Sequence, residues 1–228
     1  MLISNEIQIN DVRALVVVPA YEEQSNIAGV INELKGAGFG EILVVDDGSR
    51  DATGVVASQA GAKVIIHPVN MGLGAGLRSG FEFAVEHKYE YVLTFDGDGQ
   101  MRADDAVKIY EETQKGYDFV YGCRNFNVQG VPRIRKYTNL LADALTAFLS
   151  GKFVWDTQSG LRCIKVDLLK KLNLKSRGYS ISSELIIESL KNGVTPKPVK
   201  IDAIYTKESL KKGQKISNSF RVVKELSG

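Results

Sequence analysis

The chain has 228 residues, 44% of them hydrophobic, which is enough to bury a core in one domain of ordinary globular composition. Its 29 basic and 27 acidic residues nearly cancel, which excludes a strongly basic nucleic-acid-binding surface as the dominant feature. Two cysteines, Cys123 and Cys163, are too few for a disulfide framework and lack metal-ligand spacing, so we expect a reducing, cytoplasmic compartment.

Residues 1–12 are polar and mixed in charge, without the basic start and apolar run of a signal peptide, so we do not expect export. We expect them to precede one α/β domain over residues 13–206, followed by a basic tail over residues 207–228. The apolar-leaning stretch 140–149 contains Asp143 and is much shorter than the roughly 20 residues of a membrane-spanning helix. Any membrane contact is therefore expected to be peripheral, at the cytosolic face.

Short apolar runs alternate with helix-forming segments through the first hundred residues. The expected strands are Ala14 to Val18, stopped by Pro19, then Glu41 to Val45, Lys63 to Ile66 and Tyr91 to Phe95. The expected helices cover about residues 26–34, 52–60 and 73–87. This alternation predicts a Rossmann-like α/β fold, with a doubly wound, mostly parallel central sheet flanked by helices.

The second half of the chain mixes the same two kinds of segment. Helices are expected over about residues 104–115, 134–149 and 183–191. Short strands are expected over about residues 119–122, 163–164 and 199–205. Residues 125–132 carry two asparagines, a glycine and a proline, which predicts an exposed loop.

Two of the expected strands run directly into acidic residues. Residues 92–95 are followed by Asp96-Gly97-Asp98-Gly99-Gln100, and the second strand ends in Val45-Asp46-Asp47-Gly48-Ser49. A single Asp-Gly pair after a strand is commonly no more than a turn. Two acidic strand ends in one parallel sheet need a further explanation, because the carboxyl ends of such strands meet at the edge where these sheets bind ligands.

Carboxylates gathered at this edge repel a phosphorylated ligand unless a divalent cation bridges them, so the pattern predicts Mg²⁺ or Mn²⁺ holding a diphosphate. We expect Asp96 and Asp98 to be metal ligands and Gln100 to add a third oxygen. Asp47 is better suited to accept hydrogen bonds from ribose hydroxyls or base N–H groups, since the backbone at Val45 can approach the ring.

Several motifs, in their order and spacing, carry a family resemblance. Pro19-Ala20-Tyr21-Glu22-Glu23 and the two acidic motifs resemble the family 2 glycosyltransferases of the GT-A fold. Gly122-Cys123-Arg124 and Ser159-Gly160-Leu161-Arg162 are similar to the polyprenyl-phosphate sugar transferase branch, typified by dolichol-phosphate mannose synthase. The resemblance covers about residues 14–216, and motifs that match in register are far more specific than any one alone.

The resemblance implies a role for each matching residue. Those that would hold the donor nucleoside are Pro19, Tyr21, Glu23, Val45 and Asp47. Those that would hold the metal and the diphosphate are Asp96, Gly97, Asp98 and Gln100, with Arg124 against the donor phosphates. Arg135 and Asn139 fall where the family binds the acceptor phosphate, and Lys215 best matches a late basic motif that here lacks its arginine. The expected catalytic residues are Asp98, Arg124 and Arg135.

By this resemblance the chain is expected to be a metal-dependent inverting glycosyltransferase. It would move a hexose from a nucleotide sugar, of the GDP-mannose or UDP-glucose type, to a polyprenyl phosphate such as dolichyl or undecaprenyl phosphate. The acceptor oxygen is then already anionic and needs no general base. A saccharide hydroxyl is the alternative acceptor and needs a carboxylate to take its proton, for which Asp156 and Glu184 are the candidates.

Two other readings were weighed against this one. The glycine-rich segment 70–80 almost fits a dinucleotide-binding fingerprint, but Leu77 or Ser79 stands where the third glycine belongs, so NAD is not expected. We interpret the segment as a loop that closes over the donor or as simple packing at a helix start. A receiver-like phosphoacceptor domain also ends a strand in paired aspartates, but the strand and helix before Asp46 argue against it. The oligomeric state is left open.

Overall fold

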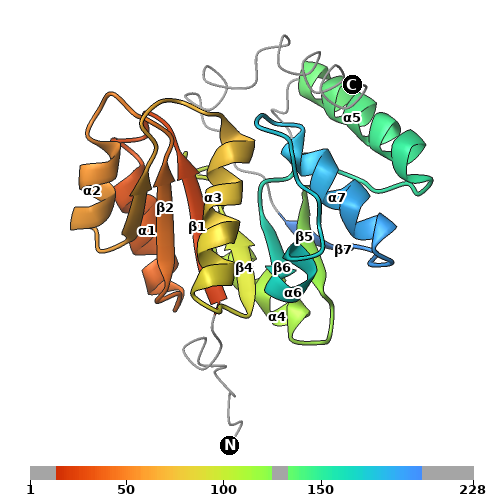
Figure 1. The fold of residues 1–228 in the computed structure, drawn as a ribbon, viewed down its shortest axis with the longest axis horizontal. Coiled ribbons are helices and arrows are strands. Elements are labelled where there is room, and N and C mark those ends of the chain that lie inside the picture. The colour runs from red at the N-terminus through yellow and green to blue at the C-terminus, as the bar shows by residue number, and fades with distance from the viewer. Residues whose placement is uncertain (1–13, 125–132, 202–228) are drawn as a thin grey trace, which may run out of the picture.

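The computed structural model describes residues 14–124 and 133–201, and within residues 133–141 only the backbone and the Leu140 side chain (Figure 1). The strands of this part are β1 (Ala14–Ala20), β2 (Ile42–Asp46), β3 (Lys63–Ile66), β4 (Tyr91–Thr94), β5 (Phe119–Arg124), β6 (Arg162–Lys165) and β7 (Lys197–Ile201). The helices are α1 (Ile27–Gly36), α2 (Thr53–Gln59), α3 (Leu73–Glu86), α4 (Ala103–Thr113), α5 (Arg133–Ser150), α6 (Val166–Leu169) and α7 (Ile181–Lys191).

The described strands form one seven-stranded sheet in the order β3-β2-β1-β4-β6-β5-β7. All neighbouring pairs are parallel except those of β6, which runs antiparallel to both β4 and β5. The order in which strands are added to the sheet reverses after β3: β2 and β3 lie on one side of β1, and β4 pairs with β1 on the other side. The mostly parallel, doubly wound sheet is thus as predicted, whereas the antiparallel strand in its middle was not foreseen.

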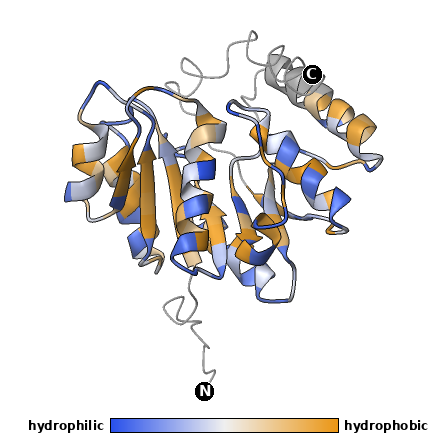
Figure 2. Cartoon of the chain, in the orientation of Figure 1, coloured by the Kyte–Doolittle hydropathy of each residue, from blue (hydrophilic) through white to orange (hydrophobic). Residues whose placement is uncertain are grey.

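The sheet is apolar on both faces, so its strands read as continuous hydrophobic runs (Figure 2). In β1, Val16 and Val18 pack into one cluster with α1, α2 and α4. The alternate residues Leu15 and Val17 pack into a second cluster with α3, α6 and α7. Helix α5 packs against α7 instead of the sheet and lies at the outside of the molecule (Figure 1).

The first strand is longer than predicted, because it continues through Pro19 to Ala20. Pro19 has no N–H, and the pairing of β1 with β4 ends at Val17, so on that side the proline removes no interstrand hydrogen bond. On the other side Ala20 still accepts a hydrogen bond from the Asp47 N–H, at 2.9 Å. A proline near the end of a strand therefore does not end that strand when the neighbouring strand on the side of its nitrogen no longer pairs there.

The remaining differences from the predicted elements are small. The short helix α6 was not predicted, and α7 begins two residues before the expected start at Ser183. No described helix meets the length and hydropathy of a membrane span. The predicted extension 1–12, loop 125–132 and tail 207–228 lie outside the described residues, as does the expected strand beyond Ile201.

Candidate active site

The carboxyl ends of β1, β2 and β4 meet at one edge of the sheet. Asp47 follows β2 and donates its N–H to the Ala20 carbonyl at 2.9 Å. Gly97 follows β4 on the other side of β1, where a Cβ added to it would lie 3.3 Å from the Pro19 carbonyl oxygen. Both acidic motifs thus flank the end of β1, as the sequence predicts for a shared crevice.

The Asp47 carboxylate binds mainly to its own chain. Its Oδ1 accepts the N–H of Met71 at 2.9 Å and lies 2.7 Å from His67 Nδ1, and its Oδ2 accepts the N–H of Gly72 at 2.7 Å. His67 contacts the Ser79 hydroxyl through Nε2, at 2.9 Å. Asp47 therefore fixes the segment between β3 and α3, which uses most of the acceptor capacity that we had expected a nucleoside to take.

The glycine-rich segment is a packed helix start. The Arg177 carbonyl accepts hydrogen bonds from the N–H groups of Gly74 and Ala75, at 2.8 and 3.3 Å. Gly72 has φ +96°, and a Cβ on it would lie 2.5 Å from the same carbonyl oxygen. These contacts occupy N–H groups that a dinucleotide phosphate would need. They support the exclusion of NAD, and they favour helix-start packing over a loop that closes on the donor.

Asp96 and Asp98 form a pair of like charges at the end of β4. Burial and the neighbouring Asp98 raise the pKa of Asp96 to about 7, while Arg162 and Arg124 oppose the rise. Gly160 lies directly against the Asp96 carboxylate, since a Cβ there would be 2.6 Å from Oδ1. Two carboxylates that disfavour ionising together are typical of a site that receives a cation.

The donor atoms fit a hard divalent cation shared with a ligand. Within residues 14–124 and 133–201, no group of three or more His, Cys, Asp or Glu side chains could hold a metal by itself. Mg²⁺ and Mn²⁺ commonly take one or two carboxylates and complete their shell with water and phosphate oxygens, which the Asp96 and Asp98 pair allows. Gln100 donates its backbone N–H to Asp98 Oδ1 at 3.0 Å and its side-chain amide to Oδ2, so here it orients Asp98.

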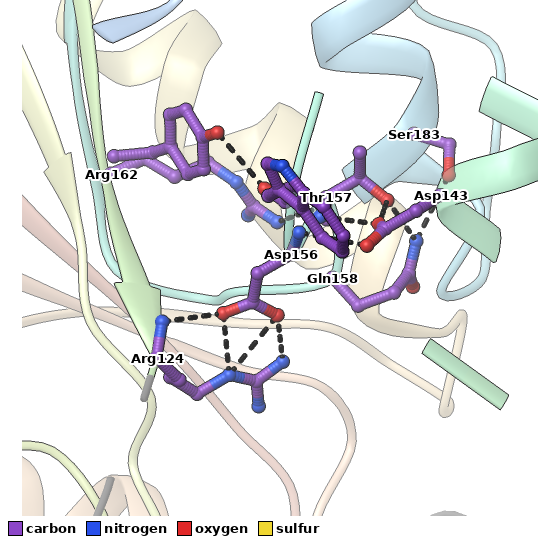
Figure 3. A network of polar contacts seen from close by, with 9 residues as sticks. Arg124, Asp143, Asp156, Thr157, Gln158, Arg162 and Ser183 are labelled. Atoms are coloured by element: carbon purple, nitrogen blue, oxygen red, sulfur yellow. Dashed lines mark hydrogen bonds and ion pairs between the residues drawn. The ribbon is translucent and has the colours of Figure 1, made fainter. Parts of the chain in front are cut away.

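Arg124, at the end of β5, is bound by Asp156 from the turn before β6 (Figure 3). The Asp156 carboxylate accepts the Arg124 backbone N–H at 2.8 Å, its Nε at 2.9 Å and a terminal guanidinium nitrogen at 2.5 Å. The Asp156 side chain is 1% exposed and the Arg124 side chain 26% exposed. The pair therefore presents a cation to solvent and keeps its anion inside.

Arg162 adds a second cation, fully buried in β6 between β4 and β5. Burial lowers its pKa to about 10, while Asp96 and Asp156 hold it up. One of its terminal nitrogens lies 3.4 Å from the Thr157 carbonyl. Arg162 thus balances one carboxylate of the acidic pair and the carboxylate that holds Arg124, which is what a buried guanidinium requires.

The two candidate bases are both engaged in holding backbone. Asp156 accepts the Arg124 hydrogen bonds described above. Glu184, on α7, accepts the N–H groups of Lys175 and Ser176 through its two oxygens, each at 2.9 Å. A general base must be able to reach the proton that it removes. Each of these carboxylates would have to give up its present partners to remove a proton.

Comparisons with known proteins decide the family. A family model described as glycosyl transferase family 2 matches residues 15–173, more than half of the chain. The chain belongs to glycosyl transferase family 2.

Two relatives of this glycosyltransferase are named for lipid phosphate acceptors or products. The UDP-N-acetylglucosamine–dolichyl-phosphate N-acetylglucosaminyltransferase of Methanococcus voltae is 31% identical over 230 residues, which cover 91% of this chain and 92% of that protein. The polyprenol monophosphomannose synthase of Mycolicibacterium smegmatis is 27% identical over 211 residues, which cover 87% of this chain and 79% of that protein. The polyprenyl-phosphate branch is thus represented among its relatives.

The fold also matches solved glycosyltransferases. The glucosyl-3-phosphoglycerate synthase from Mycobacterium tuberculosis, crystallised with Mn²⁺, UDP-glucose and phosphoglyceric acid, superposes with a TM-score of 0.75 and 20% identity. The match covers 94% of this chain and 78% of that one. At this identity the likeness shows the fold alone, which is the GT-A fold. The receiver-like alternative is wrong, because the chain is a glycosyltransferase.

The other residues predicted for the donor site of this glycosyltransferase differ in exposure and in their contacts. Pro19 is half-buried and Tyr21 is 40% exposed at the same edge. Val45 is fully buried, and its partners in the sheet are Pro19 of β1 and Ile65 of β3. Glu23 accepts a hydrogen bond from the Asn26 side-chain amide at 2.6 Å and donates its N–H to the Thr53 hydroxyl at 2.9 Å, which ties it to the starts of α1 and α2.

The acceptor-side residues are described only in part. Arg135 and Asn139 lie on α5, but their side chains are outside the described set, and Lys215 lies outside it altogether. Three further residues belong to the site, although the sequence motifs assign them no role. Tyr179 lies near both carboxylates, since burial and then Asp96 and Asp98 raise its pKa. Asp143 and Arg162 were named in the sequence without a role in the site, although a charged residue within an apolar helix or strand is a recognisable signal.

Proposed function

We propose that this glycosyltransferase moves a hexose from a nucleotide sugar, of the GDP-mannose or UDP-glucose type, to a polyprenyl phosphate. The reaction depends on Mg²⁺ or Mn²⁺ and inverts the anomeric centre. The observation that carries the proposal is the acidic pair Asp96 and Asp98 beside the cation Arg124, at the carboxyl edge of the sheet. This arrangement suits a diphosphate that binds through a divalent cation on one side and a guanidinium on the other.

The contacts of the two candidate bases, Asp156 and Glu184, favour a phosphate acceptor over a hydroxyl. Asp156 accepts hydrogen bonds from Arg124, and Glu184 accepts them from two backbone N–H groups, so either carboxylate would have to release its partners before it could deprotonate a sugar. A phosphate oxygen is already anionic at neutral pH and needs to be oriented, not deprotonated. The relatives named for dolichyl phosphate and for polyprenol monophosphomannose support the same choice.

The transfer is a single displacement. A bond forms from an acceptor phosphate oxygen to the anomeric carbon while the bond from that carbon to the donor phosphate breaks, and its electron pair leaves with the nucleoside diphosphate. A divalent cation held by Asp96 and Asp98 supplies charge neutralisation at the diphosphate when bound. Arg124, oriented by Asp156, neutralises the charge that develops on the leaving group. Arg135 on α5 binds the acceptor phosphate in this proposal.

A transfer assay tests the proposal directly. GDP-mannose, UDP-glucose and UDP-N-acetylglucosamine are each incubated with a polyprenyl phosphate, with Mn²⁺ or with EDTA, and the lipid product is identified by mass spectrometry. The matched acceptor control is the corresponding polyprenol, which carries a hydroxyl instead of the phosphate. We expect Mn²⁺-dependent transfer from one donor to the phosphate only. Transfer to the polyprenol or to a saccharide alone would overturn the acceptor assignment.

Arg135→Ala separates the two halves of the site. If Arg135 binds the acceptor phosphate, its loss raises the KM for polyprenyl phosphate by about tenfold or more, because a charge-assisted contact is worth about 1.5–3 kcal/mol. The KM for the donor is expected to stay within about twofold, since the acidic pair and Arg124 are intact. Steady-state kinetics with each substrate varied in turn measure both values. An equal rise in both would contradict an acceptor role for this arginine.

A further inference from the structure

A second aspartate stands behind the carboxylate that holds Arg124. Asp143 lies in α5, and its side chain reaches the turn before β6 (Figure 3). Its Oδ2 accepts the N–H of Asp156 at 2.9 Å, and its Oδ1 accepts the N–H and the hydroxyl of Thr157 at 2.8 and 2.7 Å. One buried carboxylate thus fixes the backbone on both sides of the Asp156 α-carbon.

The backbone at Asp156 depends on this support. Asp156 has φ +50°, a left-handed conformation that L residues adopt at a cost of about 1–3 kcal/mol unless surrounding contacts hold them there. In that conformation its carboxylate meets Arg124 at the backbone N–H and along the guanidinium edge. Loss of the Asp143 contacts would therefore let the turn relax and move the Asp156 carboxylate away from this geometry.

The contacts from Asp143 through Asp156 to Arg124 are buried at the two aspartates and reach solvent at Arg124. Asp143 and Asp156 are 3% and 1% exposed as residues, whereas the Arg124 side chain is 26% exposed. Burial raises the pKa of Asp143, and the donors from Thr157 and Asp156 act against this rise. Burying this carboxylate costs free energy, which its hydrogen bonds to the turn offset. A residue that served only to fill space in the core would be apolar.

We propose that Asp143 is a positioning residue for the donor-phosphate arginine, acting through the turn at Asp156. Because Asp143 lies on α5, the helix that carries Arg135, the same contacts join the acceptor side of the site to Arg124. The inference rests on the role proposed above for Arg124. It predicts that the effect of Asp143 on turnover passes through Arg124 and disappears when Arg124 is removed.

A double-mutant cycle tests this prediction. Asp143→Asn, Arg124→Ala and the double variant are compared with the parent by kcat in the transfer assay. Asp143→Asn keeps the size of the side chain but replaces one acceptor oxygen by a donor, so we expect kcat to fall about tenfold with the donor KM little changed. In the Arg124→Ala background the same substitution is expected to change kcat by less than about twofold.

Two further variants keep the test decisive if Asp143→Asn does not fold. Thr157→Val removes the hydroxyl that donates to Asp143 at 2.7 Å and accepts a longer contact from Gln158 Nε2 at 3.5 Å. We expect a fall in kcat of about threefold that again vanishes with Arg124→Ala. The matched control is Thr146→Val on the same helix, which removes a buried hydroxyl that donates to the Ala142 carbonyl, at 2.8 Å. We expect its kcat to equal that of the parent.

The outcomes separate this inference from the proposed function. If the Asp143 and Thr157 substitutions lower kcat by the same factor with and without Arg124, these residues act on the fold in general and the inference is overturned. If Thr146→Val lowers kcat as much as Thr157→Val, it is overturned as well. If Arg124→Ala alone turns over like the parent, the role proposed for Arg124 fails, whatever the Asp143 variants do.

Discussion

Each charged residue of the site faces a conflict between burial and charge. Asp96 is the clearest case, because its carboxylate lies beside Asp98 and Gly160, and among the described residues Arg162 and Arg124 offset it. Its raised pKa means that ionising Asp96 costs more free energy in the folded chain without a ligand than in the unfolded chain. The site is thus built for a cation at the expense of the stability of the empty protein, as is usual for functional carboxylates.

Asp96→Asn is expected to stabilise the protein in the absence of metal. The folded pKa of about 7 lies above the ordinary value of 3.8, so ionised Asp96 destabilises the fold fully above pH 7 and not at all below about pH 4. The gain in unfolding free energy should therefore be larger at pH 8 than at pH 4. Urea denaturation in EDTA at both pH values measures it. A loss of stability at pH 8 would contradict the like-charge conflict.

At the scale of the elements, α3 approaches β1 closely through two glycines. Gly76 faces Pro19 and Val45, with an added Cβ 3.6 and 3.9 Å from their side chains. Gly80, one turn later, faces Val17 so closely that an added Cβ would overlap its methyl groups. Gly76 and Gly80 therefore serve to bring a helix onto a sheet, which is a packing requirement and not a phosphate-binding one.

Gly80→Ala is expected to lower the free energy of unfolding by about 1–3 kcal/mol, since the added methyl overpacks against the branched side chain of Val17. The matched control is Gly29→Ala in α1, where nothing lies within 4 Å of an added Cβ. There the better helix propensity of alanine should raise stability by about 0.5–1 kcal/mol. Urea denaturation of both variants provides the comparison. Equal effects at the two positions would refute the close approach of α3.

At the scale of the whole molecule, the site joins the ends of strands from both halves of the sheet. The acidic motifs come from β2 and β4, and Arg124 comes from β5, on the far side of the antiparallel strand β6. The insertion of β6 places Arg162 between these groups, so that the two halves share one set of charges. A diphosphate bound with its cation would neutralise this set and should stabilise the molecule as a unit.

Thermal unfolding with Mn²⁺ and a nucleoside diphosphate measures that stabilisation. At a ligand concentration of about 100 times Kd the gain is about 2.7 kcal/mol, which corresponds to a rise in Tm of about 5–11 °C for a domain of this size. We expect the full rise only with both components, and none with Asp98→Ala, which lacks one of the two cation-binding carboxylates. A rise of the same size with the diphosphate and EDTA would rule out a cation between the carboxylates and the phosphates.

The sequence by itself determined the α/β class, the order of nearly all elements and the family. These follow from local patterns: apolar runs of strand length, helix periodicity, and acidic motifs directly after strands. The carboxyl ends of parallel strands must share an edge, so the meeting of the motifs of Asp47 and Asp98 at the end of β1 could also be foreseen. The local sequence wrongly predicted that the first strand ends at Pro19. Whether a strand can include a proline depends on which neighbouring strand still pairs at that position.

Only the tertiary structure decided which side chains are bound to one another. Asp47 fixes the start of α3, Asp156 holds Arg124, and Asp143 reaches Asp156 across 13 positions of sequence. Nothing in the spacing of these residues requires such pairs, because they form where the antiparallel strand β6 returns between β4 and β5 and where α5 packs beside α7. Hydrogen-bond partners are set by which segments the fold brings within 3 Å, and that information is not contained in any local motif.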